Sequence, residues 1–282
     1  TVQNKYTTLQ RSTLIEFLKD DIYTQHLRFG KKIKEVSELK GKVLIKFEDN
    51  TNDLVDIVVG ADGIFSNTRS FFEKKKNEPK FKKAVALRII LKTKSELNID
   101  EEKISLMMGK NCHIVIYPVN QNKELNLVCI IRDKKYDPDN IKTLVNKVVT
   151  QNSNLEKVFE GDLKSWPLYF TPKILPSTNS KVFYIGDAFN GFLPTLAQGA
   201  GQSIESAHEL FSLIKDDKAE IQNTYFKERS RRAKIVKRRS NINFFAFHFS
   251  SSIMQTLRNF FMKFLIKRKS FVNSYLGIVY KN

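Results

Sequence analysis

Residues suited to chemistry are concentrated between positions 182 and 202 of this 282-residue chain. Val182–Ile185 is an apolar run of the kind that forms a buried strand, and Gly186 and Asp187 follow it directly. A carboxylate at the carboxyl end of such a strand lies where open α/β sheets bind their ligands. We therefore expect Asp187 to face a ligand site.

A second signal is the glycine-containing stretch 199–201, which leads into a predicted helix over Gln202–Ile214. The N-terminus of a helix offers unpaired N–H groups and partial positive charge to an anionic ligand. A reduced flavin carries negative charge around N1 and its C2 carbonyl, so this helix start would stabilise it. A simple helix start explains the glycines equally well, because one such loop is a weak motif.

Other elements must position these residues. Helical spacing predicts a surface helix over Arg11–Asp20, and Ser66 is a candidate N-cap for a short helix that ends at Phe72. Alternating or apolar runs predict strands at 31–36, 42–48, 56–59, 84–91, 104–108, 113–119 and 125–131. Helical patterns also cover 141–149, 221–239 and 252–266. Together these elements predict an α/β fold.

With these elements in place, the chain resembles the flavoprotein aromatic hydroxylases, in particular the salicylate hydroxylase-like group. Residues 186–202 look like the second FAD motif of that family, and residues 56–63, followed by Ser66 and Arg69, look like its Asp-Gly motif. Arg11 is similar to the family's FAD-contacting arginine. Further matches are Gly109, His113, Tyr117, Pro118, Asn126, Tyr225, Arg229, Arg232, Val236, Ser240, Asn243, His248, Arg258 and Asn259.

The resemblance implies an enzyme that hydroxylates a small aromatic compound with FAD, O2 and either NADH or NADPH. It implies a Rossmann-like FAD-binding domain, N-terminally truncated, with an inserted mixed β-sheet substrate domain and C-terminal helices. The FAD domain would comprise residues 1–75 and 179–240, the substrate domain 76–178, and the helical segment 241–282. The implied cofactor-binding residues are Arg11, Asp62, Gly63, Gly186, Asp187, Pro194, Gly199, Ala200 and Gly201.

The resemblance also implies roles for these residues. Asp187 would bind the ribityl or phosphate part of FAD, and Pro194 and the backbone of 199–201 would lie near the isoalloxazine ring. Asp62 would serve FAD and the nicotinamide nucleotide. Activation of a phenol-like ring benefits from a base that titrates near neutral pH, which makes His113 the catalytic candidate. The alternative is that His113 is a buried, hydrogen-bonded structural histidine.

The chain departs from the family pattern in three places. It has Asn190 where the family usually has His, and Ser206 where the family has Asp. The G-x-G-x-x-G fingerprint that opens the family cannot lie in the few residues before Arg11. We therefore expect the 282 residues by themselves to bind FAD weakly or not at all. A catalytically inactive fragment of the fold is a second interpretation.

Charge and cysteine content bear on partners. The formal net charge is +18, but the dense basic run 227–239 lacks the interleaved aromatic residues that nucleic-acid binding favours, so we expect no nucleic-acid partner. Cys112 and Cys129 belong to no CxxC or Cys/His pattern, so we expect no metal site. A pair of reduced, buried thiols is typical of a cytoplasmic protein.

The C-terminal stretch 244–266 is rich in Phe, and Lys267, Arg268 and Lys269 come directly after it. We favour a helix that caps the hydrophobic core. The alternative is a helix that lies in a membrane interface, with peripheral membrane contact through this basic and apolar segment. A rival function follows from that alternative, namely a membrane-associated flavoprotein hydroxylase of a quinone precursor.

Overall fold

The structure is a computed structural model that describes residues 8–73, 77–91, 97, 99–100, 102–216, 220–275 and 277. The chain forms two compact units, each assembled from three separate segments. Unit 1 comprises Thr1–Arg28, Lys83–Leu168 and Phe245–Arg268, and unit 2 comprises Phe29–Lys82, Tyr169–Phe244 and Lys269–Asn282. The predicted domain boundaries at 75, 178 and 240 stay a prediction, because compact units and functional domains need not share their limits.

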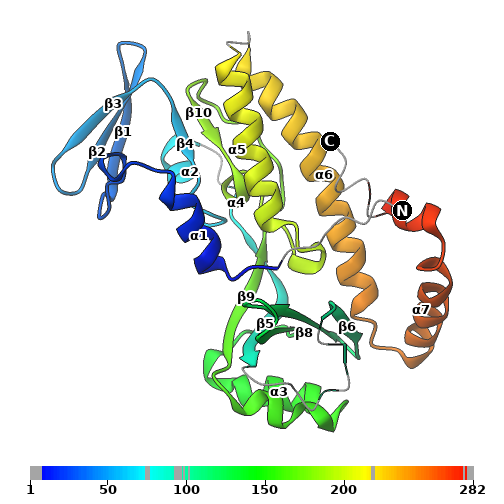
Figure 1. The fold of residues 1–282 in the computed structure, drawn as a ribbon. Helices are drawn as coiled ribbons and strands as arrows, with labels where there is room; N and C mark the ends of the chain where they lie inside the picture. Colours follow the sequence, from blue (N-terminus) through cyan, green and yellow to red (C-terminus); the bar gives the residue numbers. More distant parts are fainter. Residues whose placement is uncertain are drawn as a thin grey trace. The chain divides into compact units, whose positions relative to one another are not determined.

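Unit 1 is built on a five-stranded sheet with the order β6-β7-β8-β5-β9 (Figure 1). The pairings of β6 with β7, β7 with β8 and β8 with β5 are antiparallel. The strands are β5 (Lys80–Leu91), β6 (Ser105–Met108), β7 (Cys112–Val119), β8 (Glu124–Arg132) and β9 (Lys164–Phe170).

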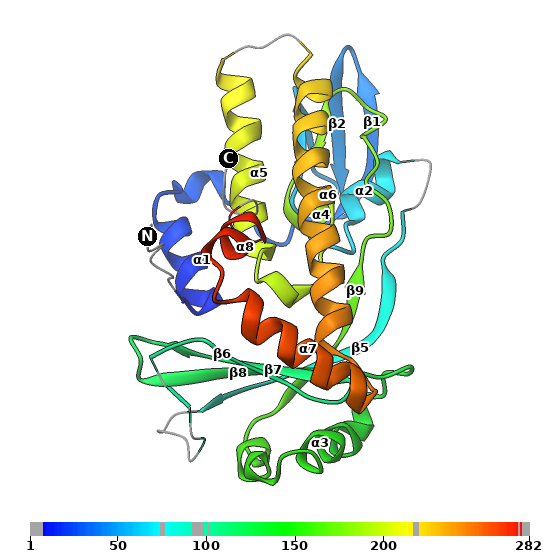
Figure 2. The ribbon, with the colours of Figure 1, turned by 90° about the vertical axis from the view of Figure 1, so that its right-hand side faces the viewer.

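The two faces of this sheet carry different partners. Ile114 and Ile116 of β7 share a hydrophobic core with Leu144 and Val148 of α3 (Ile141–Val149). Successive side chains of a strand point to opposite faces, so His113 lies on the other face. In Figure 2, α3 lies on one side of the sheet and α7 (Ser252–Leu265) on the other.

Among its described residues, unit 1 also contains α1 (Arg11–Asp20), four short 3-10 helices and α7. The 3-10 helices are η1 (Thr24–His26), η2 (Pro138–Asn140), η3 (Ser153–Leu155) and η4 (Lys157–Glu160). Arg258 is the buried residue of α7. The expectation that the stretch 244–266 caps the core holds for its first part, where Phe244 and Phe247 are buried. It does not hold for α7, where Phe260, Phe261 and Phe264 are exposed and Arg258 faces the protein.

The described part of unit 2 contains two small sheets. The first is an antiparallel meander of β1 (Ile33–Leu39), β2 (Lys42–Phe47) and β3 (Asn52–Val55), and the second pairs β4 (Val58–Gly60) with β10 (Val182–Tyr184) in parallel. The helices are α2 (Asn67–Phe72), α4 (Gly186–Phe189), α5 (Gly199–Lys215), α6 (Ile221–Phe247, to Phe244 in this unit) and α8 (Lys269–Tyr275), with the 3-10 helix η5 (Pro194–Leu196). Figures 1 and 2 both show α5 beside α6.

The core of unit 2 surrounds β10. Val182, Phe183 and Tyr184 are all buried, and they pack with residues of β2, α5 and α6 such as Val43, Leu210 and Tyr225. A strand of a parallel pair that is covered on both faces needs apolar side chains in both directions. This explains why the sequence has a continuous apolar run here instead of alternation.

Several sequence predictions are confirmed. The helices over Arg11–Asp20 and Ile141–Val149 have the predicted bounds, and Ser66 caps α2 by accepting a hydrogen bond from the Arg69 N–H at 3.0 Å. Strands β3 and β9 and helix α8 were not predicted. Among the helices that the structure describes, none has the length and hydropathy needed to cross a bilayer.

Candidate functional site

The segments that carry Asp62 and Asp187 leave the same edge of one sheet, Asp62 in a loop and Asp187 in the short helix α4. β4 and β10 are parallel and in register, with Tyr184 opposite Gly60. Ile185 continues this pairing, since its N–H donates to the carbonyl of Gly60 at 3.0 Å. Parallel strands end at a common edge, which is where α/β sheets bind ligands. Unit 2 therefore brings together the Asp-Gly motif and the second predicted FAD motif.

Two glycines allow the close packing behind this edge. Gly186 has a φ of +57°, and a Cβ on it would lie 2.6 Å from Oγ of Ser203 on α5. A Cβ on Gly60 would lie 2.9 Å from the ring of Tyr184. Neither position has room for a side chain, and the first also requires a left-handed backbone that glycine adopts readily. The glycines thus hold the end of β10 directly against β4 and α5.

Asp62 organises the loop after β4. Its carboxylate accepts hydrogen bonds from the Ser66 hydroxyl and, at 2.8 Å, from the Thr68 N–H. Burial acts to raise the pKa of Asp62, but these hydrogen bonds outweigh it and hold the pKa below its ordinary value. Asp62 is thus an ionised side chain whose hydrogen bonds shape the loop from residue 62 to the start of α2, with Gly63 inside it at a φ of +80°.

Arg69 joins the two motifs. Its guanidinium lies 4.5 Å from the centre of the Tyr184 ring and donates to the carbonyls of Phe189 at 3.3 Å and Leu175 at 3.4 Å. The Tyr184 hydroxyl in turn donates to Glu73 at 2.9 Å. The sequence showed Arg69 only as part of the Asp-Gly motif. The roles of Tyr184 and Glu73 were missed, because the buried apolar run that contains Tyr184 gives no sign of a polar partner.

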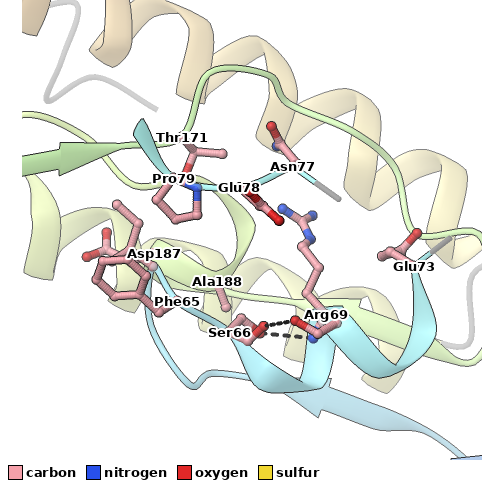
Figure 3. A pocket seen from close by; sticks show the side chains of 12 residues that line it. Phe65, Ser66, Arg69, Glu73, Asn77, Glu78, Pro79, Thr171, Asp187 and Ala188 are labelled. Carbon is pink, nitrogen blue, oxygen red and sulfur yellow. Dashed lines mark hydrogen bonds between the residues drawn. The ribbon is translucent and has the colours of Figure 1, made fainter. Parts of the chain in front are cut away.

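A cavity of about 240 Å³ lies beside this cluster (Figure 3). Phe65, Pro79 and Ala188 supply apolar wall, and charged or polar groups reach it from both motifs. The polar lining residues are Ser66, Arg69, Ser70, Glu73, Asn77, Glu78, Thr171 and Asp187. Figure 3 shows that Asp187 and Ser66 come to this cavity from different segments of the chain. The cavity suits a polar ligand with a small apolar part.

The N-terminus of α5 is open to a ligand. Gln198, the N-cap, makes no side-chain cap hydrogen bond within the described residues. Gly199, Ala200 and Gly201 are exposed, and a Cβ on Gly199 would meet no described atom within 4 Å. Their backbone N–H groups have no partner inside the helix, as in any first turn. An anionic group can therefore approach these N–H groups closely.

The loop between α4 and α5 is fixed to α6. Pro194 is exposed at the start of η5, and the neighbouring Thr195 donates from its hydroxyl to the carbonyl of Ser240 at 2.7 Å. Asn243 donates from its side chain to the carbonyl of Thr195 at 3.1 Å. These two bonds hold Pro194 in a defined position next to α5.

Of the three departures from the family pattern, the two substitutions, Ser206 and Asn190, differ in their consequences. Ser206 accepts a hydrogen bond from the Gly186 N–H at 3.0 Å, so it still ties the motif to α5 in the absence of a carboxylate. Asn190 is fully buried, and neither polar atom of its amide has a hydrogen-bond partner among the described residues. Each unsatisfied group costs about 1–3 kcal/mol. This amide, three residues after Asp187, is therefore suited to a polar ligand.

Arg11 and His113 belong to unit 1, whereas the Asp-Gly motif and the second predicted FAD motif both belong to unit 2. Arg11 is the first residue of α1 and is exposed. His113 is buried, and its Nδ1 lies 3.1 Å from Nε2 of His248, which also lies 3.3 Å from the carbonyl of Ile130.

Burial, followed by the charge of His248, lowers the pKa of His113 to about 3. An imidazole with this pKa is neutral at pH 7 and does not gain a proton near neutrality. Its contacts support the structural alternative, and the assignment of His113 as a base stays a prediction.

The donor and acceptor groups of unit 2 fit FAD. The free N–H groups of α5 suit its anionic parts, the Asp187 carboxylate suits its hydroxyl groups, and the buried amide of Asn190 offers both a donor and an acceptor.

Comparison with solved structures identifies the fold. The chain matches HpxO of Klebsiella pneumoniae in complex with FAD and uric acid, with a TM-score of 0.79 and 16% identity over 95% of this chain and 71% of that one. It matches a salicylate hydroxylase substrate complex with a TM-score of 0.72 and 17% identity over 95% of this chain and 75% of that one. The fold is thus the mixed α/β fold of the FAD-dependent hydroxylases, as the sequence predicted.

Curated relatives agree with this class. A salicylate hydroxylase of Pseudomonas putida is 26% identical over 235 residues, which are 72% of this chain and 54% of that protein. The 3-amino-4-hydroxybenzoate 2-monooxygenase PtmB3 of Streptomyces platensis is 24% identical over 271 residues, which are 90% of this chain and 67% of that protein. The chain spans about half the length of the salicylate hydroxylases that it matches.

The family model for squalene epoxidase matches residues 55–279, and the chain belongs to that family. The match begins just before β4 and covers both the Asp-Gly motif and the second predicted FAD motif. The predicted resemblance to FAD-dependent monooxygenases of the salicylate hydroxylase group is confirmed by the relatives.

Proposed function

We propose that this chain carries a large part of the FAD site of a monooxygenase that hydroxylates a small aromatic compound with O2 and NADH or NADPH. The observation that carries the proposal is the shared edge of β4 and β10, where the segments with Asp62 and Asp187 start from in-register strands. The open N-terminus of α5 adds the anion-binding group that such a cofactor needs. Two relatives are named for aromatic acids, which supports an aromatic substrate.

Each candidate cofactor-binding residue of unit 2 would have a defined role. FAD, when bound, supplies electron transfer from the nicotinamide nucleotide and the activation of O2. The Asp187 carboxylate would accept hydrogen bonds from the hydroxyl groups of the ribityl chain. Gly186 and Gly63 would allow the backbone turns that aim the two loops at the cofactor.

The N-terminus of α5 would stabilise negative charge on the cofactor. The N–H groups of Gly199, Ala200 and Gly201 would stabilise negative charge on the ring system, because they lie at the positive end of the helix dipole. Pro194, held by the bonds of Thr195 to α6, would form a fixed wall that helps to exclude water from the reacting centre. Arg11 would add a positive charge near the flavin and phosphates, and His113 would serve as base only if its neutral imidazole reaches the substrate hydroxyl.

The test is an activity screen of the purified protein, with FAD supplied at a concentration high enough to saturate even the weak binding that the sequence predicts. NADH and NADPH oxidation would be followed with a panel of hydroxybenzoates and hydroxypyridines, and products would be analysed by mass spectrometry under ¹⁸O₂. We expect one aromatic compound to stimulate oxidation and to gain one labelled oxygen atom.

A matched pair of variants links this activity to the site. Asp187→Asn should lower FAD affinity by about tenfold or more, because the neutral amide loses a charge-assisted acceptor. Asp162→Asn is the control, since this exposed carboxylate lies in unit 1 and contacts Lys164 at 3.7 Å. Equal FAD affinity in the two variants, or no stimulation by any aromatic compound, would contradict the proposal.

A further inference from the structure

The five-stranded sheet of unit 1 carries polar side chains on the face that α3 does not cover (Figure 2). Leu87 and Ile89 of β5 belong to the hydrophobic core shared with α3, as do the two neighbours of Asn126 on β8. Side chains alternate along a strand, so Arg88 and Asn126 point to the face away from α3. Tyr117 of β7 is directly opposite Asn126 in the register, which places it on the same face.

Asn126 is fully buried, and one side of its amide is unsatisfied. Nε of Arg88 donates to Oδ1 of Asn126 at 2.5 Å, and because an arginine nitrogen can only donate, this contact fixes which amide atom faces Arg88. The other atom, Nδ2, has no hydrogen-bond partner among the described residues. A buried donor without a partner costs about 1–3 kcal/mol. An amide of this kind in the middle of an apolar sheet indicates a ligand that accepts a hydrogen bond from it.

The guanidinium of Arg88 is open to an anion. Arg88 is half-buried, and within the part of the chain that the structure describes its one hydrogen bond is the bond from Nε to Asn126. Nη1 and Nη2 therefore keep the paired N–H groups that bind both oxygens of a carboxylate. Tyr117 is half-buried as well, and its hydroxyl forms no hydrogen bond with a described residue. Three polar side chains on one face thus have unused hydrogen-bonding groups.

Apolar side chains surround these three residues. Val115 and Val128 lie half-buried on the same face, and Ile90 is 37% exposed. At the other end of β7, the ring of His113 lies 5.2 Å from that of Phe247, so the end of α6 covers the sheet there. A flat apolar molecule can therefore lie on the valines and present its polar groups to Arg88.

We propose that Arg88 selects an aromatic substrate that carries a carboxylate, and that Asn126 and Tyr117 bind a second oxygen atom of the same molecule. This inference rests on the proposed function, because it names the class of aromatic compound that the monooxygenase takes. Nη1 and Nη2 of Arg88 donate to the carboxylate oxygens, while Nε keeps its bond to Asn126 and so fixes the direction of the guanidinium. A neutral molecule of the same shape lacks the charge that the guanidinium needs and binds more weakly.

The experiment compares aromatic acids with their amides on the 282-residue chain without FAD. Dissociation constants are measured by ligand-observed NMR for benzoate, for 2-, 3- and 4-hydroxybenzoate, and for the matching benzamides, which have the same shape without the charge. We expect at least one acid to bind at least about tenfold more tightly than its amide, because hydrogen bonds between charged groups are the stronger ones. Arg88→Gln should remove this preference, and Arg88→Lys should keep only part of it, since lysine has no paired N–H groups.

Lys123→Gln is the matched control. It removes one positive charge from the exposed turn between β7 and β8 and should keep the preference for the acid. Circular dichroism of each variant checks that the fold is kept. A purely structural role of Arg88 would weaken the binding of acid and amide equally and leave their ratio unchanged.

The proposal is overturned if no acid binds more tightly than its amide, or if Arg88→Gln keeps the wild-type ratio. It is also overturned if Lys123→Gln loses the preference as well, because the net charge of the chain would then be its cause. The measurement uses neither FAD nor a nicotinamide nucleotide. A preserved acid preference together with a failed activity screen would therefore contradict the proposed function and not the carboxylate site.

Discussion

Gly186→Ala should destabilise unit 2 in a way that separates two physical causes. Gly186 has a φ of +57°, and an added Cβ would lie 2.6 Å from Oγ of Ser203 and 3.2 Å from its Cβ. The first cause is the cost of a left-handed backbone for alanine, which is about 1 kcal/mol. The second is the displacement of Ser203 on α5.

The magnitude of the second cause follows from the contacts of Ser203. Its hydroxyl donates to the carbonyl of Gly199 at 3.0 Å, and rotation away from the new methyl group breaks this bond at a cost of about 1 kcal/mol. Rotation does not move the Cβ of Ser203, so some overlap stays. Together with the backbone cost, we expect Gly186→Ala to lower the free energy of unfolding by about 2–3 kcal/mol.

Urea denaturation followed by circular dichroism measures this loss. Gly41→Ala is the matched control, because Gly41 has a φ of +73° and a Cβ there would meet no described atom within 4 Å. It should cost about 1 kcal/mol, the backbone part alone. Ser203→Ala in the Gly186→Ala background should recover part of the difference. If Gly186→Ala and Gly41→Ala cost the same, the close packing of β10 on α5 is not what requires the glycine.

Three further predictions concern polar groups that are buried or half-buried. The pKa of His113 is about 3 in the folded protein and 6.5 in the unfolded chain, so the unfolded chain takes up the proton first as the pH falls. The stability that the neutral imidazole provides is therefore complete above pH 6.5 and is lost between pH 6.5 and 3, by about 1.4 kcal/mol per pH unit. Between pH 6.5 and pH 5, the free energy of unfolding measured by urea titration should therefore fall by about 2 kcal/mol more in the wild type than in His113→Gln. Arg69→Lys should lower unfolding free energy by about 1–2 kcal/mol, since lysine cannot both stack on Tyr184 and reach two carbonyls, and a wild-type value would refute that role. Arg258→Met should release α7, seen as faster hydrogen exchange over Ser252–Leu265 with unchanged exchange in β7.

Local patterns predicted much of the fold. The helices at Arg11–Asp20 and Ile141–Val149 follow from the spacing of their own apolar residues, and the Ser66 cap follows from one hydroxyl and its neighbours. Strand β9 was missed because Lys164–Phe170 contains Pro167 and an aromatic-rich sequence without clear alternation. Its place beside β5 depends on residues about 80 positions away in the chain, which no local window contains.

The site was predictable only in part. The motif residues Asp62 and Asp187 were recognised, and the parallel register of β4 and β10 explains why they occur together. The contacts of Arg69 and the unsatisfied amide of Asn190 depend on where the chain returns after long loops, so the sequence holds no pattern for them.

The orientation of α7 shows the same limit. Helical spacing revealed an amphipathic helix, but not that Arg258 would face the protein while the phenylalanines face outward. Periodicity identifies two faces of a helix and leaves open which of them meets the protein.

The in-register pairing of β4 and β10 has a consequence for how this chain can diverge from its relatives. Side chains change freely at most positions, as identities near one quarter show. A deletion of one residue, such as Val59, would change the register of β4 against β10. Every later side chain of β4 would then point to the opposite face of the sheet, and Asp62 would shift away from Asp187. Drift by substitution is therefore compatible with this site, whereas a change of length inside either three-residue strand is not.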